Sequence, residues 1–402
     1  MRIDNVSVMT AARKLSVVTG DRASFEVVIA GGGVAALEAA LALREFGGDR
    51  VALTLIACNT EFVYRPMAVI EPFRYPPVQR FPLTAIAGDI GAELLNDRLA
   101  AVAPSERVVQ TDSGVEHRFD ALVLGIGGRI RARYEHAITL EDRGSYELLR
   151  GVIDDVESGY VRRLAFVVPP RMAWPLPVYE LALFTAKRAS ERGVELAVTL
   201  LTPEDAPRGV LGDGISRGVS ELLADRGIEV IVSAHCEVPE VGQVEIASGN
   251  RRLEVDRVVA LPELYGPAVP GLPEAPDGFI PVDTNCQVRG VERVYGAGDT
   301  TDFAIKHGGI AAQQADTAAQ AIAALAGAPV EPETFHPVIH GMLLTGALPR
   351  YLRADITGGQ PITSEITMQP TWSSPDKIAA RYLAPYLNRT FGSGPGRPGS
   401  LS

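Results

Sequence analysis

The chain has 402 residues, of which 46% are hydrophobic and 22% are charged, and its formal net charge is −11. This length accommodates two or three domains with cores of their own, and the composition excludes a chain that is disordered throughout. The negative charge argues against nucleic acid as the main partner, because nucleic acids are bound largely through cationic side chains.

Neither a metal site nor a membrane-spanning helix is indicated. The cysteines Cys58, Cys236 and Cys286 lie far apart and form no CxxC motif, so no local dithiol or zinc site is expected. No apolar run approaches the roughly 20 residues that span a bilayer, and residues 1–24 lack the apolar block of a signal peptide. We therefore expect a cytoplasmic protein with an N-terminal extension, the start codon being that of Met1 or of Met9.

A glycine-rich motif follows a strand that is expected at residues 25–30. The motif is Gly31-Gly32-Gly33, and after it an alanine-rich helix is expected at 34–46 and a strand at 51–56. This β-α-β order is the context in which a glycine turn binds a dinucleotide pyrophosphate at a helix N-terminus. The residues expected to contact the pyrophosphate are Gly31, Gly32, Gly33, Ala35 and Ala36.

A second half-site lies near the other end of the chain. Residues 294–299 form an expected strand, two small residues and Asp299, whose carboxylate would accept a hydrogen bond from a hydroxyl of the same ligand. A buried strand at 120–128 ends in glycines, which include Gly127, and an alanine-rich helix is expected at 308–325. Together the two half-sites predict FAD.

From about residue 137 the alternation of helices and strands begins again. Helices are expected at 142–157, 179–192 and 215–226, and strands at 164–168, 195–201, 229–232 and 257–261. The predicted fold class is α/β, with two Rossmann-like three-layer domains and a small C-terminal α+β region. The expected segments are an extension at 1–24, an FAD-binding domain at 25–136 and 269–328, a second Rossmann-like domain at 137–268, a C-terminal region at 329–391 and a disordered tail at 392–402.

On these motifs the chain resembles the two-dinucleotide-domain flavoproteins of the pyridine nucleotide-disulfide oxidoreductase superfamily. Within it the chain is most similar to the branch of sulfide:quinone oxidoreductase and the flavin subunit of flavocytochrome c sulfide dehydrogenase. The resemblance implies a glutathione-reductase-like fold over about residues 25–326. The motifs that carry it are Gly31-Gly32-Gly33, Phe62-Val63-Tyr64-Arg65-Pro66, residues 123–128, Gly298-Asp299 and residues 305–314.

The resemblance also implies roles for single residues. Lys306 would lie beside the isoalloxazine ring, where a cation stabilises the negative charge of reduced flavin. His307 would be a proton donor and Trp174 an aromatic wall that selects a planar acceptor; the alternatives are an exposed lysine, a structural histidine and a packing tryptophan. Further expected FAD contacts are Asn59, Arg65, Val102, Gly127, Gly298, Asp299, Gly308 and Gly309.

Two departures from the resemblance narrow the function. The turn after strand 164–168 contains prolines and no glycine, and prolines lack the N–H groups that hold a pyrophosphate, so NAD(P)H is not expected to bind in the usual mode. The redox cysteines of the sulfide-oxidising branch have no counterpart, since Trp174 stands near the position of one, and a persulfide route needs two thiols. Residues 62–67 lack the cysteine that attaches flavin in the flavocytochromes, so FAD is expected to be noncovalent.

The sequence therefore predicts an oxidoreductase that transfers electrons through noncovalent FAD between a small reductant and a quinone-like or other planar acceptor. One alternative is an NAD(P)H-dependent quinone or dye reductase of the type II NADH dehydrogenase kind. Another is a flavin-carrying binding or regulatory protein without turnover. The amphipathic segment 377–387 would contact the inner face of the membrane, form a homodimer contact or simply pack.

Overall fold

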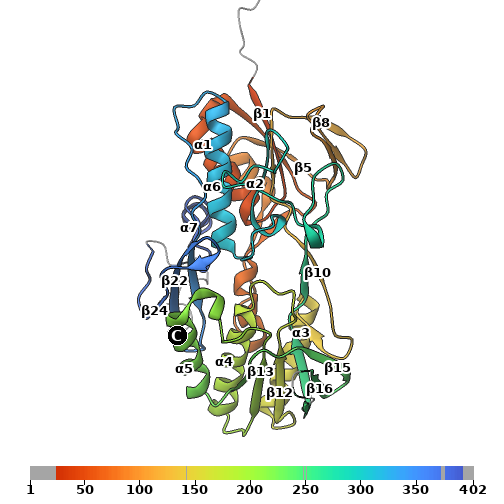
Figure 1. Cartoon of the computed structure of the whole chain (residues 1–402), viewed down its shortest axis with the longest axis vertical. Helices are drawn as coiled ribbons and strands as arrows, with labels where there is room; N and C mark the ends of the chain where they lie inside the picture. The colour runs from red at the N-terminus through yellow and green to blue at the C-terminus, as the bar shows by residue number, and fades with distance from the viewer. Residues whose placement is uncertain (1–23, 142, 248, 250, 373–375, 393–402) are drawn as a thin grey trace, which may run out of the picture.

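The computed structural model describes residues 24–141, 143–247, 249, 251–372 and 376–392. The molecule is elongated, with two α/β units stacked along its long axis (Figure 1). Apart from Ser24 and Gly392, the predicted N-terminal extension and tail lie outside the described residues, and so does the choice between Met1 and Met9.

The first unit is built on a five-stranded parallel sheet in the order β20-β9-β1-β2-β5. Helices α1 and α6 pack side by side against this sheet (Figure 1), and the antiparallel strands β6, β7 and β8 cover its other face. The elements of this unit are β1 (Phe25–Ala30), α1 (Val34–Gly47), β2 (Val51–Ile56), β3 (Glu61–Val63), β4 (Arg80–Pro82), α2 (Leu83–Asp89), β5 (Ala92–Leu95), β6 (Leu99–Ala103), β7 (Val108–Thr111), β8 (Glu116–Arg118), β9 (Ala121–Leu124), β20 (Val294–Gly296) and α6 (Gly308–Leu325).

The second unit repeats this plan with a parallel sheet in the order β11-β18-β12-β13-β14. An antiparallel sheet of β15, β16 and β17 packs on one face; the sequence did not predict it. Two parallel sheets in an α/β chain confirm the predicted fold class. The elements are β11 (Ile138–Thr139), α3 (Arg143–Glu157), β12 (Arg163–Val167), α4 (Leu176–Glu191), β13 (Ala197–Leu201), α5 (Asp213–Asp225), β14 (Glu229–Ile231), β15 (Cys236–Glu240), β16 (Gln243–Ile246), β17 (Arg251–Glu254) and β18 (Arg257–Ala260).

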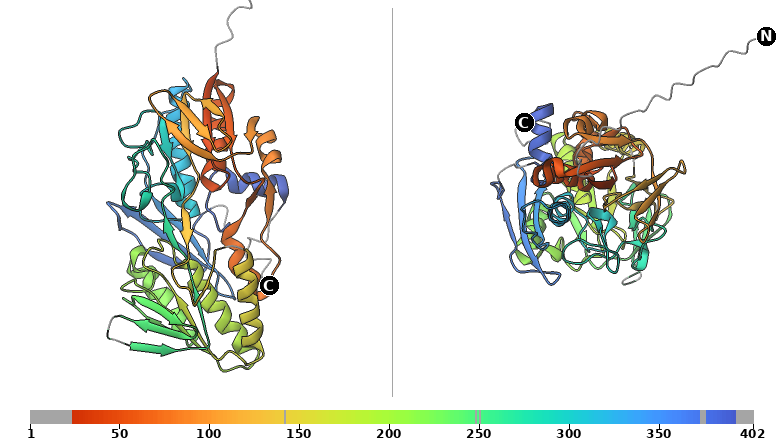
Figure 2. Two further views of the ribbon diagram at one scale, coloured as in Figure 1. Left: turned by 90° about the vertical axis from the view of Figure 1, so that its right-hand side faces the viewer. Right: turned by 90° about the horizontal axis from the view of Figure 1, so that it is seen from above.

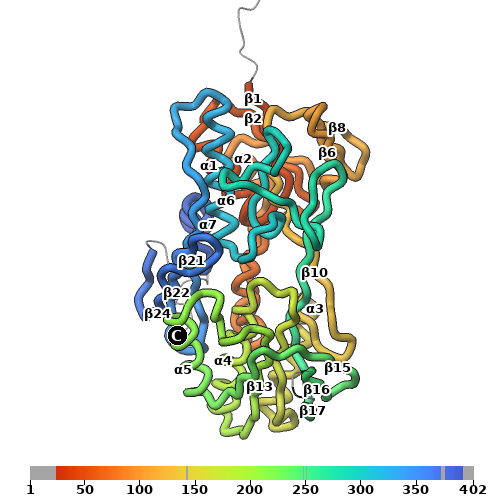
Figure 3. The backbone as a smooth tube through the Cα atoms, in the orientation of Figure 1, coloured from red at the N-terminus to blue at the C-terminus, as the bar shows by residue number. Residues whose placement is uncertain are grey.

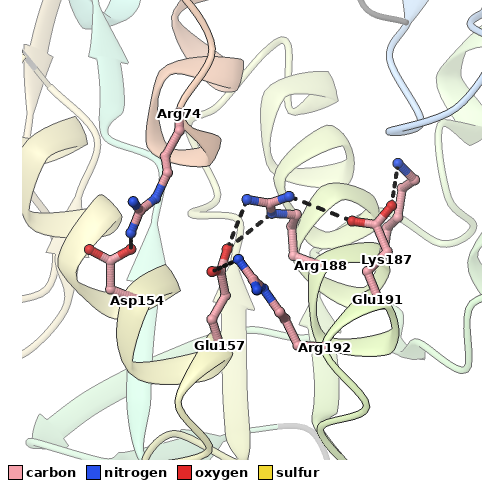
Figure 4. Close-up of polar contacts among 7 residues, drawn as sticks. All are labelled: Arg74, Asp154, Glu157, Lys187, Arg188, Glu191 and Arg192. Atoms are coloured by element: carbon pink, nitrogen blue, oxygen red, sulfur yellow. Dashed lines mark hydrogen bonds and ion pairs between the residues drawn. The ribbon is translucent and has the colours of Figure 1, made fainter.

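Two kinds of contact join the units. The chain crosses between them in β10 (Arg129–Arg131) and β19 (Glu263–Tyr265), which pair antiparallel and which the sequence did not predict. Arg74, at the end of the 3-10 helix η2 (Arg65–Phe73), lies 2.7 Å from Asp154 of α3. Glu157 of α3 in turn binds Arg188 of α4 at 3.0 Å (Figure 4). The Arg74–Asp154 pair thus connects the first unit to α3, and the Glu157–Arg188 pair connects α3 to α4 within the second unit.

The C-terminal region lies along one side of both units (Figures 1 and 2). It comprises β21 (Val338–Leu343), β22 (Arg350–Thr357), β23 (Gln360–Pro361), β24 (Glu365–Thr367) and α7 (Leu383–Phe391). As the tube in Figure 3 shows, the chain returns to the first unit at its end, where α7 lies near α1.

Of the three uses expected of segment 377–387, the structure shows packing. Its apolar side chains are buried within the molecule and belong to the same core as those of α1 and α6; they are Ile378, Leu383, Tyr386 and Leu387. Packing is therefore the use that the structure makes of this stripe, because a buried face is not available to lipid. Among the described residues, no helix combines the length and apolarity that crossing a bilayer requires.

Candidate functional site

The glycine turn after β1 is held in close contact with the end of β9. Gly31 has a φ of +128°, and a Cβ atom built on it would lie 2.2 Å from the carbonyl oxygen of Gly125. Its N–H donates to the carbonyl oxygen of Ile56 at 2.8 Å. Gly32 is also confined, since its Cβ would lie 2.8 Å from Leu83 Cδ1. Only glycine fits Gly31 without moving the backbone.

The N-terminus of α1 is open beyond this turn. Gly33 is its N-cap residue, with no side-chain cap and no acidic residue in the first turn, so the first N–H groups have no intrahelical acceptor. A Cβ atom on Gly33 would meet nothing within 4 Å. Ala35 and Ala36 are buried beside the turn. Uncapped N–H groups at a helix N-terminus and its positive dipole end together suit an anion such as a pyrophosphate.

The second half-site lies next to the first. Gly298 has a φ of +76°, and its Cβ would lie 3.3 Å from that of Ala35. Its N–H donates to Gln314 Oε1 of α6 at 2.8 Å. The carbonyl oxygen of Gly127, at the end of β9, accepts a hydrogen bond from Thr300 at 3.1 Å. Residues far apart in sequence are thus brought together around the N-terminal end of α1.

A cavity of about 670 Å³ lies between the two units. The first unit contributes Asn59, Arg65, Asp299, Lys306, His307 and Gly308, all predicted site residues. The second unit contributes Trp174 and a largely apolar wall with Met172, Leu176, Pro177, Leu261 and Leu264. Gly309 directly follows the lining residues, in the first turn of α6. The cavity therefore brings together seven of the predicted site residues.

Asp299 and Lys306 form the charged side of the cavity. Lys306 is buried, its Nζ donates to the carbonyl oxygen of Thr301, and it lies 4.0 Å from the centre of the Phe279 ring. Burial lowers the pKa of Lys306 to about 8, although Asp299 and Asp302 oppose the shift. Burial likewise raises the pKa of Asp299, against the effect of Lys306 and Arg65. Each charge is thus stabilised mainly by the other's presence.

His307 is a neutral imidazole that caps α6. Its Nδ1 accepts a hydrogen bond from the N–H of Gly309 at 3.2 Å, so the ring proton is on Nε2. Burial lowers the pKa of His307 to about 3, assisted by His340, Arg208 and Lys377. The sequence predicted a proton donor here. The structure assigns Nδ1 to the helix cap and leaves only the Nε2–H, which is a hydrogen-bond donor rather than a source of imidazolium protons.

Val102 is the predicted site residue that lies elsewhere. Its side chain packs with Val109 and Phe119 in the core beneath the sheet. The N–H of Val102 donates to the carbonyl oxygen of Pro270 at 3.0 Å. Gly271 lies so close that a Cβ atom built on it would be 1.8 Å from the carbonyl oxygen of Val102. Because its backbone groups and side chain are already in contact with protein, Val102 is corrected to a core residue.

The turn of the second unit lacks the features that hold a pyrophosphate. Helix α4 begins after Pro175 and has Pro177 in its first turn, and proline supplies no N–H. Glu204, which follows β13 where a dinucleotide fold places its ribose-binding acid, accepts hydrogen bonds from Tyr179 at 2.6 Å and Arg208 at 3.0 Å. The start of α4 therefore has a proline in place of an N–H donor, and Glu204 is already bound to protein groups.

Sequence reasoning missed a buried ion pair in the cavity wall. The sequence gives Lys377 only as the first residue of the amphipathic segment 377–387. Lys377 Nζ lies 2.7 and 2.6 Å from the two carboxylate oxygens of Glu180, and both line the cavity. They are 197 residues apart, so no local spacing signals the pair.

No cysteine lines this cavity. Cys236 and Cys286 are buried and Cys58 is exposed. Burial raises the pKa of Cys236 to about 12 and that of Cys286 further still. Thiols with such pKa values are not nucleophilic at neutral pH. In the part of the chain that the structure describes, no group of three or more His, Cys, Asp or Glu side chains is arranged to hold a metal.

Known proteins match this chain in sequence. A family model described as pyridine nucleotide-disulphide oxidoreductase matches residues 179–322. The sulfide-quinone reductase of Aquifex aeolicus is 26% identical over 60% of this chain and 59% of its own length. The ferredoxin reductase subunit of a 5,5'-dehydrodivanillate O-demethylase from a Sphingobium species is 24% identical over 60% of this chain and 66% of its own length. Each match thus spans less than two thirds of the relative.

Solved structures match over more of the chain. The sulfide:quinone oxidoreductase of Aquifex aeolicus has a TM-score of 0.76 at 19% identity and covers 92% of this chain and 90% of its own. A ferredoxin reductase from Rhodopseudomonas palustris has a TM-score of 0.64 at 19% identity, over 82% of each chain. At these identities the match establishes the fold. The family model, the relatives and the solved structures agree in one similarity: this chain is similar to pyridine nucleotide-disulphide oxidoreductases, and sulfide-quinone reductase is among the matches in both sequence and structure.

Proposed function

We propose that this chain is an FAD-dependent oxidoreductase that passes electrons between a small reductant and a quinone-like or other planar acceptor. The observation that carries the proposal is the closeness of the open N-terminus of α1 to the charged side of the cavity: Gly298 packs against Ala35 of α1, and the next residue, Asp299, lines the cavity together with Lys306. The relatives, named as a sulfide-quinone reductase and a ferredoxin reductase subunit, support redox chemistry of this class.

The residues present fit FAD. The turn at Gly31 is too close to Gly125 for any side chain, whereas Gly33 faces open space, as a pyrophosphate lying on the turn would require. Asp299 lies in the cavity wall without a hydrogen-bond donor to its carboxylate among the described residues, so it is available to a ligand hydroxyl. FAD, when bound, would supply the electron-accepting ring system.

The chain's own residues would then act on charge, orientation and access. Lys306 would place a positive charge near the ring and favour its reduced, anionic form. His307 would donate a hydrogen bond from Nε2, and Trp174 would form a flat apolar surface against a planar acceptor. FAD is proposed to be noncovalent, because among the lining residues no cysteine offers an attachment point.

The first experiment asks what reduces the flavin. In stopped-flow mixing, NADH or NADPH is expected to bleach the flavin slowly even at millimolar concentration, because the prolines of the second turn and the engaged Glu204 remove the usual nucleotide contacts. Rapid bleaching at micromolar nucleotide would instead support an NAD(P)H-dependent quinone or dye reductase of the type II kind.

The second experiment asks whether the flavin turns over. Dithionite-reduced protein mixed with a short-chain ubiquinone is expected to reoxidise faster than it does with oxygen alone, and the protein is expected to be inactive as a sulfide oxidase by a persulfide route. Tight FAD binding without reoxidation by any quinone or dye of the panel would favour a flavin-carrying binding or regulatory protein.

A further inference from the structure

Arg208 has a buried guanidinium group and is not among the residues predicted to bind FAD or to act in catalysis. Its side chain is 1% exposed, and it lies in the loop after β13, with a left-handed φ of 55° at the start of a short 3-10 turn. Nη1 donates to Glu204 at 3.0 Å, whereas Nε and Nη2 have no hydrogen-bond partner. A buried charge with two unpaired donors is unfavourable unless another contact stabilises it.

That other contact is the indole of Trp174. The guanidinium carbon lies 4.6 Å from the centre of the Trp174 ring, within the range of a cation–π interaction, which is stronger when the cation is desolvated. On the cavity side, Trp174 lies 4.5 Å from the His307 ring, with the two planes at 47°. Arg208, Trp174 and His307 therefore form a continuous row from the interior of the second unit to the cavity.

The inner end of this row is fixed by the hydrogen bonds of Glu204. Glu204 stands at the ribose-binding position of the fold, and its Oε2 accepts hydrogen bonds from Tyr179 at 2.6 Å and Thr202 at 3.1 Å. Its Oε1 accepts from Arg208. With both oxygens bound, the carboxylate holds the guanidinium in one orientation, since an Arg–carboxylate contact is directional.

We propose that Arg208 is a positioning residue that holds Trp174 against His307 and so sets the shape of the acceptor side of the cavity. This inference rests on the proposed function, which gives the cavity its planar acceptor. Glu204 serves as the support for Arg208. The role is specific to a planar guanidinium, because an aliphatic side chain of the same length would lack both the hydrogen bond and the cation–π contact.

The test uses the full chain in a Trp372→Phe background, which leaves Trp174 as the single tryptophan. In Arg208→Met, the Trp174 emission is expected to move to longer wavelength and its quenching by acrylamide to increase, because the indole gains access to water. With dithionite-reduced protein, the concentration of short-chain ubiquinone that gives half-maximal reoxidation is expected to rise about tenfold, while the amount of bound FAD stays the same.

Two further variants separate positioning from folding. Arg188→Met removes an arginine of α4 that binds Glu157 and is not part of the row (Figure 4), and it should change neither emission nor quinone dependence. Glu204→Gln/Arg208→Met removes the buried charges together, which protects the fold from an unpaired carboxylate, yet it should still release Trp174. Unchanged Trp174 emission and quenching in folded Arg208→Met would overturn the proposal. Absence of reoxidation in the parent itself would count against the proposed function, and the emission data would still decide the role of Arg208.

Discussion

Lys377 Nζ is within 2.7 Å of both carboxylate oxygens of Glu180, and this buried pair ties the C-terminal segment to helix α4 of the second unit. Glu180 also accepts the N–H of Leu344 at 2.8 Å. Burial raises the pKa of Glu180 and lowers that of Lys377, and each partner opposes the shift of the other. The pair is stable because its members neutralise each other where water is scarce.

The first prediction follows from removing one member of this pair. Lys377→Met should reduce the free energy of unfolding by about 3–5 kcal/mol, since it leaves a buried carboxylate without its partner. Lys187→Met, which breaks the partly exposed Lys187–Glu191 pair, should lower it by about 0.5 kcal/mol or less. Urea denaturation monitored by circular dichroism measures both, and equal losses in the two variants would contradict the prediction.

A second prediction concerns the charge on Lys306. Because its pKa in the folded protein is about 8 and thus below the ordinary value of 10.5, Lys306 carries its charge below pH 8 and loses it as the pH rises through 8. If that charge stabilises reduced flavin, the flavin potential should fall through this range more steeply in the parent than in Lys306→Met.

The same shift gives a readout that does not depend on flavin. In protein freed of its cofactor, the unfolded chain retains the Lys306 proton up to pH 10.5, whereas the folded chain releases it near pH 8. The parent should therefore gain about 3 kcal/mol of stability relative to Lys306→Met between these pH values. Parallel stability curves for parent and variant would mean that Lys306 is not desolvated as the structure indicates.

The elements that could be predicted from the sequence are those that depend on interactions between residues close together in the chain. The glycine turn, the helix at α1 and the two parallel sheets were predicted because strand and turn signals are local. The sheet β15-β16-β17 and the β10–β19 pair were missed, since their short strands carry weak alternation and depend on partners far away in sequence.

The candidate site divides in the same way. Lys306, His307 and Asp299 lie in sequence motifs that single them out as candidates, and the structure places them around one cavity. Glu180 pairs with a residue 197 positions away, and Arg208 acts through Trp174 of another loop. Such contacts form only when the chain folds, so they cannot be predicted from the spacing of residues or from composition.

A third prediction compares two glycines of one turn. The Gly33→Ala variant should fold like the parent, because the added Cβ meets no protein atom within 4 Å. It should bind FAD at least about tenfold more weakly, since the methyl group takes up the space in which the pyrophosphate would lie. Gly31→Ala should fail to fold normally, because its Cβ would meet the Gly125 carbonyl at 2.2 Å.

The measurement is the ratio of flavin to protein after purification, together with thermal unfolding. Gly88→Ala, also unhindered and situated in α2, is the matched control and should retain full FAD content. FAD from the parent should be released by acid precipitation, as a noncovalent cofactor is. Full FAD binding by Gly33→Ala would place the cofactor elsewhere, and flavin that remains in the precipitate would indicate a covalent bond.

The last prediction concerns two buried carboxyl groups beneath α7. Glu38 of α1 accepts the N–H groups of Tyr382 at 2.8 Å and Leu383 at 2.5 Å, and so caps α7. The charge of Glu38 helps to raise the pKa of Asp316 of α6 to about 8, and the Oδ1 of Asp316 is buried without a hydrogen-bond partner among the described residues. Burial raises the pKa of both groups, while Arg381 opposes the shift.

The direction of the pH effect follows from these raised pKa values. Between about pH 4 and pH 8 the folded chain retains a proton that the unfolded chain has lost, so the pair's contribution to stability declines as the pH rises through this window. Asp316→Asn removes the second carboxyl and should make the unfolding free energy less dependent on pH there, whereas Glu38→Gln should in addition weaken the cap of α7 by about 1 kcal/mol. The measurement is hydrogen exchange of the α7 amides from pH 6 to 8, with the intrinsic pH dependence subtracted. Exchange should accelerate more in the parent than in Asp316→Asn, because repulsion between the two ionised carboxylates loosens the cap that Glu38 provides to α7. Identical acceleration in both proteins would show that the charge of Asp316 does not act on Glu38.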